Sequence, residues 1–95
     1  MNIEIDGSGI HSEEAFHTAI ASELNLPSHY GKNLDALFDV LSTDVERPLI
    51  FAWKNSSISR AAIGERFDLI IDVLRKVERQ DVEWGLPEKF ELRLS

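Results

Sequence analysis

Pro48-Leu49-Ile50-Phe51-Ala52-Trp53, near the middle of the chain, is a continuous apolar run. A run without polar alternation is typical of a strand in a parallel sheet that is covered on both faces. Asn55-Ser56-Ser57 follows closely and breaks the pattern. The run is far too short to cross a bilayer, which takes about 20 apolar residues in a helix. We therefore expect 48–53 to form a strand that is buried on both of its faces.

The sequence on either side of this run switches between the periods of strands and helices. Ile3 and Ile5 alternate with polar residues, and Phe90–Leu94 alternates in the same way, which predicts two more strands. Three stretches between the strands have the spacing of amphipathic helices, and a short helical piece is expected at 59–63. The three apolar stripes are Phe16, Ile20 and Leu24; Leu34, Leu37, Phe38 and Leu41; and Phe67, Ile70, Ile71, Leu74 and Val77.

Strands that are separated by helices pair in parallel through right-handed crossovers. The sequence therefore predicts an α/β fold with a small three-stranded parallel sheet and three to four helices, and it leaves the order of the strands open. Ser12 is placed to cap the first helix, which should end before Pro27. A loop over 28–32 leads to Asn33, a good cap for the second helix.

Length and composition set the class of protein. The chain has 95 residues, 43% of them apolar, and no cysteine, which suits one compact domain over 1–95 without disulfides. Met1–Asp6 has neither the basic flank nor the apolar run of a signal peptide. We therefore expect a soluble, cytoplasmic protein.

The charge is strongly acidic, with 17 Asp and Glu against 10 Lys and Arg and a net charge of −7. Such a field repels nucleic acid and anionic lipid, and it favours approach to basic surfaces. Acidity that serves only solubility is the alternative explanation. The position of the acids has to separate the two explanations.

Asp35 and Asp39 lie four residues apart on the second predicted helix, and Asp44 and Glu46 follow it. Asp35 belongs to the first turn, where a carboxylate is favourable. Asp39 lies in the middle of the helix, where aspartate is a poor helix former and repels a like charge four residues away. Asp39 slightly destabilises the helix and has no evident structural role, which suggests a functional carboxylate. A solvated acidic face is also common.

An enzyme that uses Asp35 and Asp39 as general acid and base is a third possibility. The chain has no cysteine, no glycine-rich phosphate loop, no serine elbow and no HExxH motif. Its histidines, His11, His17 and His29, lack the spacing of metal ligands. We read His11 and His17 as ordinary surface or flank positions, and we expect neither an enzyme nor a cofactor.

The stretch from Leu26 to Leu41, LPSHYGKNLDALFDVL, resembles the central motif of the barstar family, the intracellular inhibitors of secreted ribonucleases. The similarity continues through Val45–Leu49 to Trp53, and the order of predicted elements matches over nearly the whole chain. The resemblance implies that a loop and an acidic helix fill the active site of a ribonuclease. It implies Asp39 as the principal mimic of an RNA phosphate and Asp35 as a second anionic contact. It also implies a loop of Tyr30, Gly31 and Asn33 that fits the cleft.

The chain departs from this family pattern at several positions of the implied surface. His29 replaces a tyrosine, Phe38 replaces a tryptophan, and Asp44 replaces an aromatic residue. Lys76, on the last predicted helix, stands where the family has an acidic contact. The segment 81–87 is an additional piece before the last strand. His29, Phe38, Asp44 and Lys76 are candidate partner contacts, and these departures bear on which protein is bound.

Lys76 has two interpretations. It lies four residues after Asp72, a spacing that predicts an ion pair on the helix surface. Alternatively, Lys76 faces the partner and disfavours a basic rim, and this is the interpretation that we favour.

Two functions remain after this reasoning. The first is an inhibitor or immunity protein for a cognate nuclease, monomeric and forming a one-to-one complex with this basic protein. The second is an interaction module with the same fold that binds a different basic toxin or a regulatory protein. Neither function involves binding to nucleic acid or to a membrane.

Overall fold

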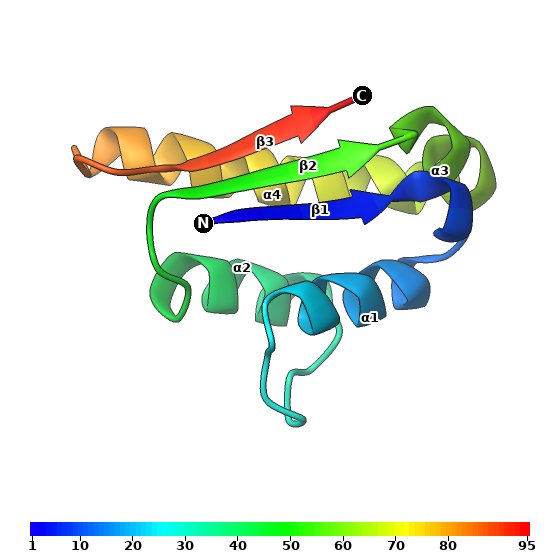
Figure 1. The fold of residues 1–95 in the computed structure, drawn as a ribbon, viewed down its shortest axis with the longest axis horizontal. Coiled ribbons are helices and arrows are strands. Elements are labelled where there is room, and N and C mark those ends of the chain that lie inside the picture. The colour runs from blue at the N-terminus through cyan, green and yellow to red at the C-terminus, as the bar shows by residue number, and fades with distance from the viewer.

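A computed structural model describes residues 1–95 and shows four helices packed on a three-stranded parallel sheet (Figure 1). This confirms the predicted α/β class. The strand order is β1-β2-β3, with β2 in the centre. In chain order the elements are β1 (Asn2–Asp6), a single 3-10 turn η1 (Gly7–Gly9), α1 (Glu13–Glu23), α2 (Leu34–Thr43), β2 (Leu49–Lys54), α3 (Ser56–Ile63), α4 (Glu65–Glu83) and β3 (Phe90–Leu94).

The helices cover one face of the sheet, so the expectation that 48–53 is covered on both faces is wrong. Leu49, Phe51 and Trp53 are fully buried, while Ile50 and Ala52 on the opposite face are only partly buried. The reason is the strand order. Both crossovers advance in the same direction across the sheet, and right-handed crossovers of that kind place their helices on the same face.

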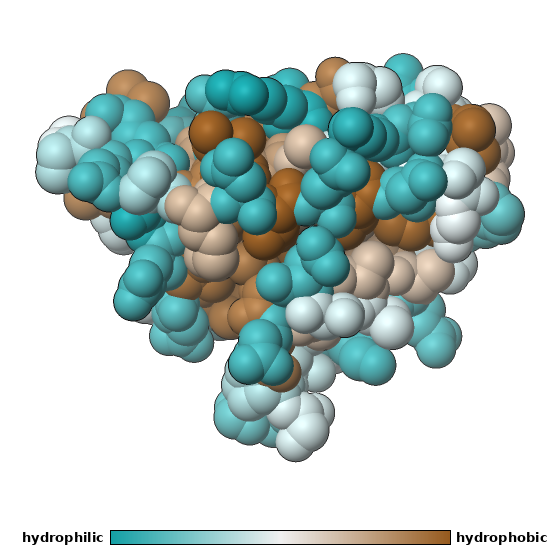
Figure 2. All heavy atoms as spheres, viewed as in Figure 1, coloured by the Kyte–Doolittle hydropathy of each residue, from teal (hydrophilic) through white to brown (hydrophobic).

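The open face of the sheet keeps an apolar centre between charged side chains (Figure 2). Ile50 pairs in register with Glu91, and Ala52 pairs with Glu4 and Arg93. An exposed Glu4–Lys54 ion pair lies on one side, with 3.3 Å between its charged atoms. Charged neighbours of this kind keep a half-buried apolar strip narrow.

The buried face contains a single core of 17 residues that reaches from the strands to α1, α2 and α4. Its centre is aromatic. Trp53 has no exposed surface, and its ring centroid lies 5.0 Å from that of Phe16 and 5.1 Å from that of Phe67. Phe16 and Phe67 come from the first and last long helices, so this contact joins both crossovers to β2.

Two helix bounds differ from the sequence prediction. α3 begins at Ser56 rather than Ser59, and α4 continues past Arg79 to Glu83. The additional segment 81–87 is therefore not a separate connection, because its first three residues form the last turn of α4. The helix ends at Glu83, and the chain turns away at Gly85, whose φ of +66° suits a glycine. None of the helices is long and apolar enough to span a membrane.

Asp81 holds the last turn of the longer helix in place. Its side chain is buried, and it accepts hydrogen bonds from Arg47 Nε at 2.7 Å, from Arg47 Nη2 at 3.2 Å and from the Phe90 N–H at 2.7 Å. Burial pushes the pKa of Asp81 up, but the bonds from Arg47 and Phe90 outweigh it and hold the pKa below the ordinary 3.8. This carboxylate ties α4 to β3 and to the segment before β2.

We predict that Asp81→Ala lowers the free energy of unfolding by about 3 kcal/mol, because it leaves the Arg47 guanidinium and a backbone N–H without their buried partner. Asp72→Ala on the same helix is the control, since Asp72 is exposed and forms no ion pair. Urea unfolding at neutral pH measures both variants.

The difference in unfolding free energy between wild type and Asp81→Ala depends on pH. A folded-state pKa below 3.8 means that Asp81 stabilises the fold above this pH and that the stabilisation is lost as pH falls through the lowered pKa. The difference between wild type and Asp81→Ala should therefore shrink below about pH 4. A difference that is constant from pH 7 to pH 3 would contradict a role for the charge.

Candidate partner-binding site

The segment between α1 and α2 projects from the body of the molecule as a loop (Figure 1). Asn33 ends the loop and caps α2, as the sequence predicts. Its Oδ1 accepts a hydrogen bond from the Ala36 N–H at 2.8 Å, and its Nδ2 donates to the Gly31 carbonyl at 3.4 Å. Asn33 therefore fixes the path of the loop into the acidic helix.

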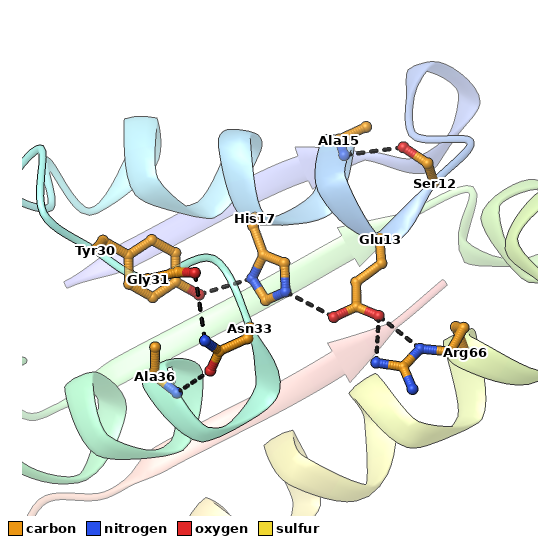
Figure 3. A network of polar contacts seen from close by, with 9 residues as sticks. All are labelled: Ser12, Glu13, Ala15, His17, Tyr30, Gly31, Asn33, Ala36 and Arg66. Carbon is orange, nitrogen blue, oxygen red and sulfur yellow. Dashed lines mark hydrogen bonds and ion pairs between the residues drawn. The ribbon is translucent and has the colours of Figure 1, made fainter.

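Tyr30 is the anchor of this loop (Figure 3). Its side chain is partly buried against the core, and its hydroxyl lies 2.7 Å from Nδ1 of His17 on α1. The ring centroids of Tyr30 and His17 are 5.7 Å apart in an edge-on arrangement. Tyr30 covers the core and is also placed to contact a partner, because its ring lines a hollow beside Asp39.

His17 continues the chain of polar contacts to Glu13 and Arg66. Its Nε2 lies 3.0 Å from Glu13 Oε2, and Arg66 Nε donates to Glu13 Oε1 at 2.7 Å. The bond from Arg66, reinforced by the one from His17, outweighs the effect of burial and lowers the pKa of Glu13. Because an ionised carboxylate can only accept, the His17 Nε2 carries a hydrogen. In the neutral imidazole, Nδ1 then accepts a hydrogen bond from the Tyr30 hydroxyl.

The interpretation of His17 as a surface position is wrong, since this side chain has no exposed surface. A hydroxyl, an imidazole and a carboxylate in series also have the order of a catalytic triad. However, burial, and after it the charge of Glu13, raises the pKa of Tyr30 well above its usual value. A phenol with a raised pKa is not an activated nucleophile, so the contacts favour a structural support for the loop.

The acids of α2 remain free of such partners. Asp35 and Asp39 are exposed, and neither takes part in any ion pair of the structure. Other carboxylates, such as Glu13 and Asp81, are paired. No cation of the chain therefore pairs with Asp35 or Asp39, the two carboxylates that the family resemblance implies as partner contacts.

Two hollows meet at Asp39. The first, here called the acidic hollow, lies between α2 and α4 and is lined by Leu34, Asp35, Phe38, Asp39, Val73 and Lys76. The second, here called the loop hollow, is lined by Pro27, His29, Tyr30, Gly31, Ala36, Asp39, Val40 and Asp44. Of the nine residues proposed from the sequence, eight line one or both hollows. The ninth, Asn33, caps the helix between them.

Lys76 belongs to the acidic hollow and not to an ion pair with Asp72, so the ion-pair interpretation is wrong. Its Nζ lies 4.9 Å from the centroid of the Phe38 ring, within reach of a cation–π contact. The ring draws the ammonium toward α2 and away from Asp72. One face of the molecule therefore carries two unpaired carboxylates beside one unpaired cation.

The sequence interpretation missed His17, Glu13 and Arg66. His17 follows the core residue Phe16, and Glu13 lies four residues before it, a spacing that places both on one helix face. This weak signal did not reveal burial, because the partners Tyr30 and Arg66 come from elsewhere in the chain. No cluster of three potential ligands for a metal ion is present.

We predict that Tyr30→Phe lowers the free energy of unfolding by about 1 to 2 kcal/mol, because it leaves the buried His17 Nδ1 without a partner. Amide hydrogen exchange should accelerate more in 28–32 than in α4, because core amides of α4 respond only to the change in global unfolding. Denaturant unfolding and exchange measured together test this. Unchanged values in both would show that the hydroxyl does not hold the loop.

Comparisons with known proteins agree with this geometry. The family model described as Barstar (barnase inhibitor) matches residues 1–94. A protein of Bacillus subtilis (strain 168) named "Putative ribonuclease inhibitor YrdF" is 33% identical over 78 residues, which cover 82% of this chain and 86% of that protein. Residues 1–94 of the family match include the sheet, the loop and both helices of the acidic hollow. The chain therefore belongs to the barstar family.

Proposed function

We propose that the chain is an inhibitor of a ribonuclease with a basic active site, and that it acts in the cytoplasm as a monomer in a one-to-one complex. The observation that carries the proposal is the pair of exposed, unpaired carboxylates of Asp35 and Asp39 beside a loop that is fixed by buried contacts. The family match and the name of the Bacillus subtilis relative support the class of target.

The physical argument begins with the chemistry of a ribonuclease cleft, which binds RNA phosphate with cationic groups. A carboxylate presented to such groups forms short, charge-assisted hydrogen bonds and excludes the phosphate. The net charge of −7 attracts a basic protein from a distance. Because the loop is already held by Tyr30 and His17, little conformational entropy is lost on binding.

The second candidate is an interaction module that binds a different basic toxin or a regulatory protein. The exchange of an acidic contact for Lys76 favours it, because the surface of the acidic hollow is no longer uniformly anionic. Both candidates use the same surface, and they differ in whether the bound protein cleaves RNA.

The function is tested by RNA cleavage. The immobilised chain is used to retain proteins from the culture medium of its own organism, and retained proteins and barnase are then assayed on a fluorogenic RNA with increasing amounts of the chain. Inhibition that is complete at one chain per ribonuclease supports the proposal. Retained proteins without ribonuclease activity, together with no inhibition of barnase, would favour the interaction module.

We predict that Asp39→Ala weakens the complex by about 2 kcal/mol or more, because cationic groups of the partner lose their buried counter-charge. Folding should be unaffected, since Asp39 is exposed and unpaired. Asp72→Ala is the matched control, as it removes the same charge from an exposed position outside both hollows. Calorimetric titration gives the affinities, and equal affinities for the two variants would remove Asp39 from the interface.

We predict that Lys76→Glu strengthens binding to barnase and weakens binding to the chain's own partner. The ammonium over Phe38 repels a basic rim, so reversing its charge favours the partner class that it now excludes. Lys89→Glu is the control, with the same change outside both hollows. Both affinities are measured for both variants, and changes of equal size toward the two partners would place Lys76 outside the interface.

A further inference from the structure

Trp84, at the C-terminal end of α4, is a large apolar side chain with 62% of its surface exposed. The other tryptophan, Trp53, is completely buried in the core. A single exposed apolar side chain is common on protein surfaces. Its surroundings decide whether Trp84 has a role.

Trp84 lies at the end of a hollow that continues the acidic hollow along α4. This third hollow, here called the Trp84 hollow, is lined by Phe38, Lys76, Arg79, Gln80, Glu83 and Trp84. Phe38 and Lys76 line both hollows. A continuous surface therefore runs from Asp39 and Asp35 on α2 to Trp84.

The charges along this surface change from acidic on α2 to basic on α4, with the carboxylate of Glu83 beside Trp84. The acids Asp35 and Asp39 stand at its start, and Lys76 and Arg79 follow on α4. Neither Lys76 nor Arg79 forms an ion pair with a carboxylate of the chain. A partner that complements the surface is basic opposite Asp35 and Asp39, and carries carboxylates opposite Lys76 and Arg79.

The end of the helix holds Trp84 on a fixed backbone. The Trp84 N–H donates to the Gln80 carbonyl at 2.9 Å, and the chain then turns at Gly85, so that the Leu86 N–H reaches the Asp81 carbonyl at 3.1 Å. The side chain of Asp81 is bound to Arg47 and to β3. An aromatic side chain on a rigid support loses little entropy when it is covered, and tryptophan is enriched among the residues that dominate binding energy.

We propose that the partner-binding surface extends along α4 to Trp84, and that Trp84 inserts into an apolar socket on the same basic protein that Asp39 engages, beside an acidic patch that faces Lys76 and Arg79. This rests on the proposed function, because it assigns a second contact region to the same ribonuclease. A second copy of the chain is a less suitable occupant, since each copy carries a charge of −7.

The chain supplies a matched control in Val82. It lies two residues before Trp84 and is 64% exposed, but it lines a different hollow together with Pro48 and Ile50 beside the sheet. Trp84→Ala and Val82→Ala both shorten an exposed apolar side chain on the last turns of α4. Only the first variant alters the proposed surface.

The experiment measures the dissociation constants of wild type, Trp84→Ala, Val82→Ala and Asp39→Ala against the ribonuclease that the immobilised chain retains from the culture medium. Trp84→Ala should bind about tenfold more weakly or worse, and Val82→Ala should stay within about twofold of wild type. Thermal unfolding verifies that each variant is folded.

Fluorescence gives an independent reading. The exposed Trp84 should emit at long wavelength in the free chain, and its emission should shift to shorter wavelength in the complex. Trp84→Phe should reduce this shift, because the remaining Trp53 is buried in both states and any tryptophan of the ribonuclease contributes equally to both complexes. A shift of equal size in wild type and Trp84→Phe would contradict insertion of Trp84.

The outcomes separate the two proposals. Weak binding by Asp39→Ala with wild-type affinity in Trp84→Ala would overturn the Trp84 contact and leave the inhibitor function in place. If the chain inhibits no ribonuclease, the proposed function fails and the Trp84 contact fails with it. A homodimer of the free chain that Trp84→Ala dissociates would show that this surface serves self-association, which also overturns the proposal.

Discussion

The central position of β2 is the constraint on which the rest of the molecule depends. β2 is paired on both sides, and the chain crosses from β1 to β2 and from β2 to β3 in the same direction. All helices therefore gather on one face, where α2 of the first crossover packs against α4 of the second. The acidic hollow lies along this contact. Residues more than 35 positions apart, such as Asp39 and Lys76, share one surface for this topological reason.

Two buried polar clusters support that surface from opposite ends. Glu13, His17 and Tyr30 hold the loop before α2, and Arg47 and Asp81 hold the last turn of α4. Each cluster satisfies its own charges internally, and no buried side-chain nitrogen or oxygen lacks a hydrogen-bond partner. The carboxylates of α2 are left for an external partner, because no cation of the chain forms an ion pair with them and the ammonium of Lys76 lies over Phe38.

The regular elements could be predicted from the sequence because their signals are local. The stripe of Phe16 and Ile20 and the caps Ser12 and Asn33 depend only on neighbouring residues, and the structure has them as predicted. The cover over Ile50 could not be predicted, since it depends on strand order. The burial of His17 could not be predicted either, because an isolated histidine gives no sign of the Tyr30 hydroxyl that meets it.

The candidate site was found from the sequence mainly through the family motif, and local physics contributed the unusual position of Asp39. Contacts of charged side chains between different elements of the fold could not be predicted from the sequence. Lys76 has an acid four residues before it, yet its ammonium lies over Phe38 of another helix. Asp81 pairs with Arg47, 34 residues away in sequence. Such pairs depend on which helix faces touch, and periodicity within one helix does not contain that information.

The hydrogen bonds from α4 to β3 have a consequence for how the protein behaves at high concentration. β3 is the last strand of the sheet, and an outer strand with free N–H groups is a template for pairing with another chain. Here the outward N–H groups of Phe90 and Leu92 donate to the carboxylates of Asp81 and Glu78, and Arg75 binds the Leu92 carbonyl. This edge of the sheet is occupied by helix side chains, which protects β3 from pairing with a strand of another chain.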